Sequence, residues 1–415
     1  MKINCFMLGV IPNVHRLRRS RFPIMNYPRA LVVAGLLTAL PAWAVYAPIP
    51  DQEQGKEWTV TLRGDVTNDT NIFGAQSGAI SSMVYEAAPK VAFNASVTQQ
   101  TFLSASYELT VDYFSDRPGT KTLDSHDFNG RLAHAFSSET TLDLSDDYSI
   151  AKNPESLLAG VAINTDQSYK RNELNGKVST SLAPRVGATV KVRSINYRYD
   201  NDTLATSLDR TENLYGLALS YDVVPELKSV GEYRHETVSY RTAGANKDKQ
   251  TDFLIGGVDY ALAKQFTATG RLGYQWRHRD LERSTSSPYA EFSGKYDYAQ
   301  NSFLSAGYVY TFEETSNVAL YTDTKVNRFF VNVQHALSPL VVASGSFTYE
   351  PSVLQGRRGL PNANETTTRL GLALSYLMSK NWMLSAHFDH DNVNSDDVSR
   401  GQRRDRTGAG ASYAF

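Results

Sequence analysis

The chain has 415 residues, with 42 basic and 43 acidic side chains, a net charge of −1 and a mean hydropathy of −0.37. This balanced charge gives no support for a nucleic-acid partner. The single cysteine, Cys5, lies in the first 44 residues, so the remainder has no disulfide, no thiolate nucleophile and no cysteine metal site. Mean hydropathy does not separate a soluble secreted protein from a membrane-spanning β-barrel, because only alternate residues of a barrel strand face lipid. The periodicity of the sequence does separate them.

The N-terminal segment is predicted to be a secretory signal peptide. Six basic residues and no acidic residue accompany an apolar run over residues 30–40, and Ala42-Trp43-Ala44 forms a small-residue cleavage site. An apolar run of this length is too short for a spanning helix, which needs about 20 residues. We expect export and cleavage after Ala44. Two alternatives stay open: a start at Met25, which begins a complete leader by itself, and twin-arginine export through Arg18-Arg19, although the motif around that pair is poor.

From Trp58 onward, apolar and polar side chains alternate in segments of about 10 to 14 residues. In residues 266–276 the even positions hold Phe, Ala, Gly, Leu, Tyr and Trp, and most odd positions hold Thr, Arg or Gln. Residues 290–298 alternate in the same way. A helix would spread both sets around its surface, so this pattern predicts β-strands with one apolar and one polar face. Aromatic residues gather toward the ends of these strands, as an interfacial girdle requires.

Short turns and longer loops alternate between the predicted strands. The turns fall near Ala95, Ser138, Pro184, Pro225, Lys264, Asn301, Pro339 and Lys380. The loops fall near residues 68–80, 115–122, 150–167, 200–209, 241–250, 280–287, 314–324, 351–364 and 391–402. Eight turns and nine loops give eighteen strands, with both ends of the series on the short-turn side. Bacterial outer-membrane barrels have an even strand count and short periplasmic turns.

The predicted fold class is therefore all-β: a transmembrane antiparallel up-and-down β-barrel of about eighteen strands. Sixteen strands would result if the two segments with the weakest alternation did not form strands. The predicted organisation is a signal peptide over residues 1–44, a short periplasmic tail over residues 45–56 and an outer-membrane barrel over residues 57–415. The alternative is a secreted soluble sandwich, whose apolar face would be a core rich in Ile, Val and Leu. Here that face mixes Leu, Ala, Gly and Val with aromatics near the strand ends, which favours the barrel.

The last strand carries a feature of its own at the C-terminus. Tyr413 and Phe415 lie on its apolar face, and the small residues Ser412 and Gly410 lie on the other. A terminal aromatic resembles the signal by which bacterial outer-membrane barrels are recognised for insertion. We therefore expect outer-membrane localisation, with lipid, lipopolysaccharide, periplasmic chaperones and the barrel-assembly machinery as partners.

No catalytic motif is present in the sequence. It lacks a Gly-x-Ser-x-Gly elbow, a His-Glu-x-x-His motif and a phosphate-binding glycine loop, so we expect no enzymatic activity, no cofactor and no metal. His387 and His390 would project to opposite faces of a strand and could not chelate one ion. The acidic pairs Asp146-Asp147 and Asp396-Asp397 have oxygen ligands suited to calcium, but acidic loop residues are commonly only solvated.

Charged residues on the polar face are the candidate pore lining. The basic candidates are Arg131, Lys177, Lys191, Arg193, Arg234, Arg271, Arg277, Lys295, Arg328 and Arg369. The acidic candidates are Glu108, Asp112, Asp127, Asp143, Glu173, Glu232, Glu291, Asp297 and Glu313. Charges on a water-filled wall select solutes through the local field, but the mixture of signs gives no strong ion preference. In the alternative interpretation they pair across strands and stabilise the wall. The loop over residues 150–167 is the predicted constriction.

The first hairpin carries a family resemblance. Thr67 to Phe73, with the sequence TNDTNIF, is followed by a polar loop, by APKVAF over residues 88–93, and by FLSASYELTVDYF over residues 102–114. This order resembles the β-barrel porin 2 family of Gram-negative outer-membrane proteins. The resemblance implies an outer-membrane barrel, in some cases encoded with exopolysaccharide systems, and supplies no catalytic residue. We therefore expect either a passive channel for hydrophilic solutes, or a conduit for a secreted polysaccharide. The alternative is a non-conducting structural or surface-binding barrel associated with an export system.

Overall fold

The computed structural model describes residues 57–152, 168–242, 247–262, 265–279, 282–315, 320–397 and 400–415. The predicted signal peptide, the predicted tail over residues 45–56 and residues 153–167 of the predicted constriction loop lie outside the described residues. The barrel described below is formed by Glu57–Phe415.

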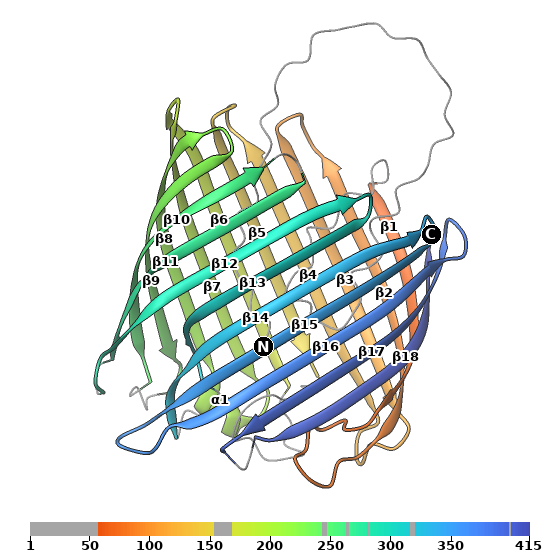
Figure 1. Ribbon diagram of the computed structural model, residues 1–415. Coiled ribbons are helices and arrows are strands. Elements are labelled where there is room, and N and C mark those ends of the chain that lie inside the picture. Colours follow the sequence, from red (N-terminus) through yellow and green to blue (C-terminus); the bar gives the residue numbers. More distant parts are fainter. Residues whose placement is uncertain are drawn as a thin grey trace, which may run out of the picture. The chain divides into compact units, whose positions relative to one another are not determined.

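Eighteen antiparallel strands form one sheet that closes on itself (Figure 1). In chain order they are β1 (Trp58–Asp69), β2 (Ser82–Ser96), β3 (Thr101–Phe114), β4 (Thr122–Ala135), β5 (Thr140–Ala151), β6 (Tyr169–Ala183), β7 (Val186–Tyr199), β8 (Arg210–Val224), β9 (Leu227–Tyr240), β10 (Lys249–Leu262), β11 (Phe266–Arg279), β12 (Thr285–Ala299), β13 (Ser302–Glu313), β14 (Tyr321–Ser338), β15 (Val341–Gly356), β16 (Ala363–Leu377), β17 (Trp382–Ser395) and β18 (Gln402–Ala414). Each strand pairs with its neighbours in the sequence, and β1 pairs with β18 from Thr61↔Ala414 to Asp69↔Arg406. The predicted fold class and the count of eighteen are confirmed, and the count of sixteen is excluded.

Short connections join the strands at one rim of the barrel and longer ones at the other. We call these the turn rim and the loop rim; β1 begins and β18 ends at the turn rim. Two-residue turns include Pro184-Arg185 and Gln300-Asn301, and Asn301 has a φ of 54°, which asparagine tolerates in a tight hairpin turn. The first turn comes slightly later than predicted, because β2 continues through Ala95 to Ser96. In the described part of the chain the one helix is α1 (Asp202–Leu208), at the loop rim, and no helix there is long and apolar enough to span a membrane.

The outer wall is apolar. Along β1, Trp58, Val60, Leu62 and Val66 are 62%, 40%, 49% and 42% exposed, and the odd-numbered residues that alternate with them face the interior. Exposed aliphatic and aromatic side chains continue on the other strands, with Leu254 and Leu272 among the most exposed. A soluble protein rarely leaves such a continuous apolar surface in water. The outer surface therefore suits a hydrocarbon environment.

Aromatic side chains form a band near each rim of the outer wall, as the sequence predicts. At the turn rim, Trp382 and Phe415 flank Tyr413, with ring centroids 5.0 Å and 4.7 Å from the Tyr413 ring. Toward the loop rim, the rings of Tyr85 and Tyr113 lie 6.3 Å apart and those of Tyr274 and Trp276 lie 5.1 Å apart. Leucine, valine, alanine and glycine occupy most outward positions between the bands. Two aromatic girdles around an aliphatic band are the outward pattern of a transmembrane barrel.

The TNDTNIF segment fastens the first loop to the last strand. Asp69 is buried and receives hydrogen bonds from the Arg404 guanidinium, including one of 3.0 Å from Nε. Asn71, also buried, donates from Nδ2 to the carbonyls of Ala75 and Arg403 at 2.8 Å and 3.0 Å. The segment therefore stabilises the seam where β1 meets β18. Asp69 and Asn71 have a structural role there.

Candidate pore lining

The charged residues predicted to line a pore lie on the inner wall. In each strand they alternate with exposed outward residues; Glu232, for example, precedes the outward Tyr233, and Lys191 lies between the outward Val190 and Val192. The inward positions include all of the predicted set: Arg131, Lys177, Lys191, Arg193, Arg234, Arg271, Arg277, Lys295, Arg328, Arg369, Glu108, Asp112, Asp127, Asp143, Glu173, Glu232, Glu291, Asp297 and Glu313. The inner wall is therefore charged throughout, but exposure of these side chains differs strongly between two regions.

The first region, the packed arc, is the inner face of β6–β11. Lys191 Nζ donates to Glu232 Oε1 at 2.8 Å, reaching from β7 across β8 to β9, and Arg234 Nε donates to the same oxygen at 2.9 Å. The side chains of Lys191 and Glu232 are 4% and 0% exposed. Arg234 also donates to the hydroxyl of Tyr289, which donates to Glu291 at 2.7 Å. These charges stabilise one another in a layer that solvent scarcely reaches.

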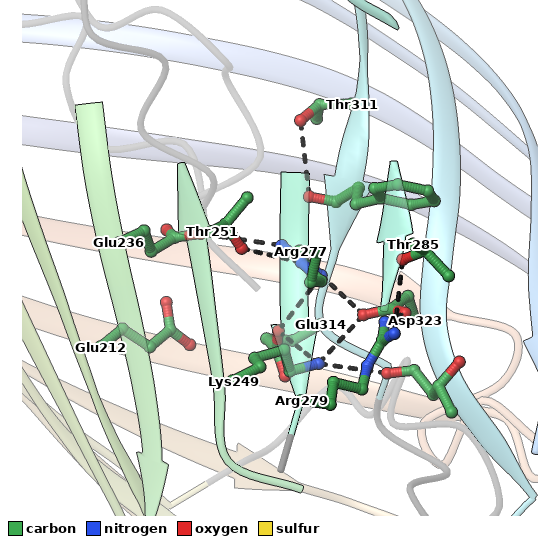
Figure 2. A network of polar contacts seen from close by, with 12 residues as sticks. Glu212, Glu236, Lys249, Thr251, Arg277, Arg279, Thr285, Thr311, Glu314 and Asp323 are labelled. Atoms are coloured by element: carbon green, nitrogen blue, oxygen red, sulfur yellow. Dashed lines mark hydrogen bonds and ion pairs between the residues drawn. The ribbon is translucent and has the colours of Figure 1, made fainter. Parts of the chain in front are cut away.

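The packed arc continues at the loop rim as a network of five charged groups (Figure 2). Lys249 Nζ lies 2.8 Å from Glu314 Oε1 and 3.0 Å from Asp323 Oδ1, and Arg277 Nη1 lies 2.6 Å from the same Asp323 oxygen. Arg279 pairs with the other oxygen of Asp323. The side chains of Arg277 and Asp323 are each 1% exposed. Carboxylates and basic groups are thus interleaved, and each buried charge has an opposite charge beside it.

The ionisation of Glu314, in the loop after β13, reflects this arrangement. Burial by itself would raise the pKa of the Glu314 carboxyl. The positive charges of Lys249 and Arg277 outweigh that effect and lower the pKa to about 2. Glu314 is therefore ionised at neutral pH, and its charge is part of the native network.

The helix α1 packs against the inner wall of the packed arc. Asn201 caps its N-terminus by accepting from the amides of Thr203 and Leu204, and Leu204 and Leu208 are the helix's buried residues. These leucines form one apolar cluster with Ile195, Tyr197, Tyr199, Val238 and Tyr240, which are inward residues of β7 and β9. The helix therefore covers part of the lumen side of the wall at the loop rim.

Asp209 holds the end of α1 in place. It is buried, and its Oδ1 accepts from the amide of Tyr199 at 2.8 Å, while its carbonyl accepts from the amide of Arg241 at 2.9 Å. The guanidinium of Arg210, the next residue, lies 4.2 Å from the centre of the Tyr197 ring, a cation–π distance. The connection between β7 and β8 is thus fixed to the wall by hydrogen bonds as well as by apolar packing.

The second region, the wetted arc, is the inner face of β1–β5. Arg131 binds Asp143 through two hydrogen bonds of 2.9 Å and 2.8 Å, yet the two side chains are 28% and 41% exposed. Arg63 pairs with Glu86 and, at 3.3 Å, with Glu108. None of the charged side chains in these pairs is buried. Water therefore reaches the Arg131–Asp143 pair most freely, in contrast to the Lys191–Glu232 pair of the packed arc.

The two arcs also differ in the sign of their charge. The inward carboxylates of β1–β5 are Asp65, Asp69, Glu86, Glu108, Asp112, Asp127, Asp143 and Asp147, and the inward basic residues there are Arg63, Lys90 and Arg131. The inward basic residues of β6–β11 are Arg171, Lys177, Lys191, Arg193, Arg210, Lys228, Arg234, Lys249, Arg271, Arg277 and Arg279, and the inward carboxylates there are Glu173, Glu212, Asp222, Glu232, Glu236 and Asp259. The wetted arc therefore has an excess of inward carboxylates, and the packed arc has an excess of inward basic groups.

The remaining strands carry further ion pairs. Arg328 of β14 binds Glu350 at 2.6 Å and Glu313 at 3.0 Å. Near the turn rim, Lys295 and Asp297 lie 2.8 Å apart and are both about two-fifths exposed. Several of the predicted lining residues thus pair across strands, as the alternative interpretation of the sequence expects, and others are close to water.

Sequence reasoning missed Lys249, Arg279, Glu314 and Asp323, which complete the loop-rim network. They lie at strand ends or just beyond them, where alternation stops, and Asp323 follows a register shift in β14. The helix α1 was also missed. Its signal is present in the sequence as the Asn201 cap followed by leucines four residues apart, at 204 and 208.

The candidate metal-binding residues are placed apart. His387 faces the lumen beside Asp65, with 3.6 Å between Nδ1 and Oδ2, whereas His390 faces outward. Asp146 faces outward and accepts from Asn172 Nδ2 at 3.0 Å, and Asp147 faces inward. Asp396 accepts from the amide of Asn364, which lowers the pKa of its carboxyl. Across the described ranges, no three potential ligands come together as a metal site would require.

Comparisons with known proteins place only the fold. No family model matches the chain, and no curated protein matches it. The barrel is similar to that of OccAB4 from Acinetobacter baumannii, at 11% identity and a TM-score of 0.45, over 88% of this chain and 100% of that one. OpdK from Pseudomonas aeruginosa, solved with vanillate, is 9% identical with a TM-score of 0.47, over 86% of this chain and 98% of that one. The FrpB iron transporter of Neisseria meningitidis is 10% identical with a TM-score of 0.43, over 87% of this chain and 82% of that one. Similarity at this level shows the fold and carries no argument about function. The function is argued from the barrel's own residues.

Proposed function

We propose that the protein is an outer-membrane channel through which small hydrophilic solutes diffuse. The observation that carries the proposal is the contrast between the two sides of one closed wall. The outer side is apolar with two aromatic bands, and the inner side is charged. A wall of eighteen strands is wide enough to enclose an aqueous channel, and the part-exposed ion pairs of the wetted arc lie where such a channel would pass.

The placement in the outer membrane follows from the same features. The predicted leader directs export, and Tyr413 and Phe415 form the predicted insertion signal read by the assembly machinery after periplasmic chaperones deliver the chain. The short-turn rim would face the periplasm and the loop rim, with α1, the outside. Lipid and lipopolysaccharide would contact the outer wall.

We further propose that the protein belongs to the β-barrel porin 2 family and takes part in exopolysaccharide export. Both proposals are supported by the TNDTNIF segment of the first hairpin and by the layout of strands and loops. A polysaccharide conduit would need a continuous wetted surface from rim to rim, and the wetted arc supplies inward polar residues along the full length of β1–β5.

One observation favours the alternative of a non-conducting structural or binding barrel. In the packed arc, Lys191, Glu232 and Arg277 pair with opposite charges and are buried, so this part of the inner wall is covered by paired side chains. The wetted arc argues against complete filling. No catalytic role is assigned to any residue.

The test is the conductance of the full-length protein, processed by the cell, purified from outer membranes in detergent and inserted into planar lipid bilayers. Stable current steps proportional to voltage are expected. A correctly folded barrel that gives no current over many insertions would contradict the channel and leave the structural barrel as the better account.

A further inference from the structure

We infer that ions cross this barrel along the wetted arc and that this path prefers cations. The inference rests on the proposed channel function and adds its selectivity. It combines two independent observations, namely which inward charges are accessible to water and how their signs are distributed around the wall.

The exposure of the inward charges to water indicates where ions pass through the barrel. On β6–β11 the side chains of Lys191, Glu232 and Arg277 are covered, and the exposed pair Lys228 and Asp222 lies near the turn rim. On β2–β5, Glu108 and Asp143 are part-exposed. The helix α1 adds a further layer on the packed side at the loop rim. A hydrated ion needs a surface that water reaches, so the inferred route between the rims lies beside the wetted arc rather than beside the packed arc.

The charge of that route then sets its preference. Inward carboxylates outnumber inward basic groups on the wetted arc, where Asp65, Glu108, Asp112, Asp127, Asp143 and Asp147 stand against Arg63, Lys90 and Arg131. A low-dielectric wall focuses the field of such an excess into the lumen. A local potential of only about −1 kT per unit charge concentrates K⁺ over Cl⁻ about sevenfold at the wall.

The basic excess of the packed arc does not cancel this field along the route. Its guanidinium and ammonium groups are engaged at short range, as in Lys191–Glu232 at 2.8 Å and Arg277–Asp323 at 2.6 Å. The side chains of Lys191 and Arg277 are also covered, and electrolyte screens charges beyond about 8–10 Å at physiological ionic strength. The field that a passing ion experiences is therefore mainly that of the nearer, wetted wall.

Two neighbouring aspartates provide a matched test of the inference. Asp147 faces the lumen and Asp146 faces outward on the same strand, so Asp147→Asn and Asp146→Asn change the same charge at nearly the same depth on opposite sides of the wall. The readout is the reversal potential of single channels in a tenfold KCl gradient, taken only from variants with the wild-type heat-dependent gel mobility of a folded barrel. A combined Asp112→Asn, Asp127→Asn, Asp147→Asn variant enlarges the effect.

The expected result is a K⁺ to Cl⁻ permeability ratio above 1 in the wild type, lowered by Asp147→Asn, brought to about 1 or below by the combined variant and unchanged by Asp146→Asn. Conducting channels that are unselective or anion-selective, or an equal shift from the two single variants, would overturn the inference and leave the channel function standing. The absence of current from folded barrels would instead overturn the channel function and the inference with it.

Discussion

The packed arc and the wetted arc are built from the same alternating strands and nearly the same residue types, yet they use charge differently. In the packed arc, Lys191, Glu232 and Arg234 form short, buried contacts that span three strands. In the wetted arc, Arg131 and Asp143 form an equally good bidentate pair that water reaches. The difference teaches that pairing by itself does not tell whether a charged inner wall is structural. The extent to which a charged pair is removed from water shows whether it is structural. The two arcs should therefore respond differently to the loss of an arginine.

The largest effect is expected from Arg277→Ala at the centre of the loop-rim network. The substitution removes the most buried basic partner of Asp323, which keeps Lys249 and Arg279, and one of the two basic partners of Glu236. Removing one member of a buried ion pair typically costs about 3–5 kcal/mol. Guanidinium unfolding of the barrel in lipid vesicles should show a loss of this size in the free energy of unfolding. A loss below about 1 kcal/mol would mean that the network is not desolvated.

The pH dependence of stability should reveal the same network through Glu314. Its folded pKa, about 2, lies below the usual value of 4.5, so the ionised form adds stability above pH 4.5. That contribution is lost as the pH falls from 4.5 through about 2, and amounts to about 3 kcal/mol. The free energy of unfolding should therefore fall further between pH 5 and pH 2.5 in the wild type than in Glu314→Gln. Parallel pH profiles for the two proteins would contradict this assignment.

The attachment of α1 is tested by Leu208→Ala. Leu208 is 2% exposed within the cluster that joins the helix to Tyr197 and Val238, and truncating a buried leucine costs about 2–5 kcal/mol. We expect a cost at the lower end of this range, about 2 kcal/mol, because the short helix α1 can relax around the cavity. Amide hydrogen exchange at residues 202–208 should accelerate, and single-channel conductance should rise. Unchanged exchange would show that Asp209 alone holds the connection.

The smallest effect is expected from Arg131→Ala, the counterpart of Arg277→Ala in the wetted arc. Because both partners of this pair are solvated, its loss should change the free energy of unfolding by no more than about 1 kcal/mol. The same guanidinium titration measures it. A cost as large as that of Arg277→Ala would remove the distinction between the arcs.

The sequence predicts the barrel well because period-2 alternation is a local property. Residues 266–276 show their two faces without any knowledge of their neighbours, and turn residues such as Pro184 and Asn301 mark where hairpins reverse. The charged inner face was predicted for the same reason. Grouping the charges by strand was also possible from the sequence, since the wetted arc and the packed arc are each continuous in the chain.

The sequence does not show how deeply each charged side chain is buried. Lys191 reaches Glu232 across an intervening strand, and Asp323 joins Arg277 after a register shift, so both contacts depend on three-dimensional placement. The burial of α1 likewise depends on the inward direction of its loop. Whether an inner-wall charge is wetted therefore becomes visible only in the closed barrel.

The most direct test of the two-arc account is the reactivity of single cysteines on the inner wall. The chain's single cysteine, Cys5, lies in the predicted leader, so Ser145→Cys in β5 and Ala218→Cys in β8 each introduce one thiol into the barrel. Both positions face the lumen at similar distances from the turn rim, but Ala218 is 6% exposed and Ser145 is part-exposed. A charged, membrane-impermeant thiol reagent should modify the cysteine at 145 rapidly and the cysteine at 218 only after unfolding. Equal rates in the folded protein would contradict the account.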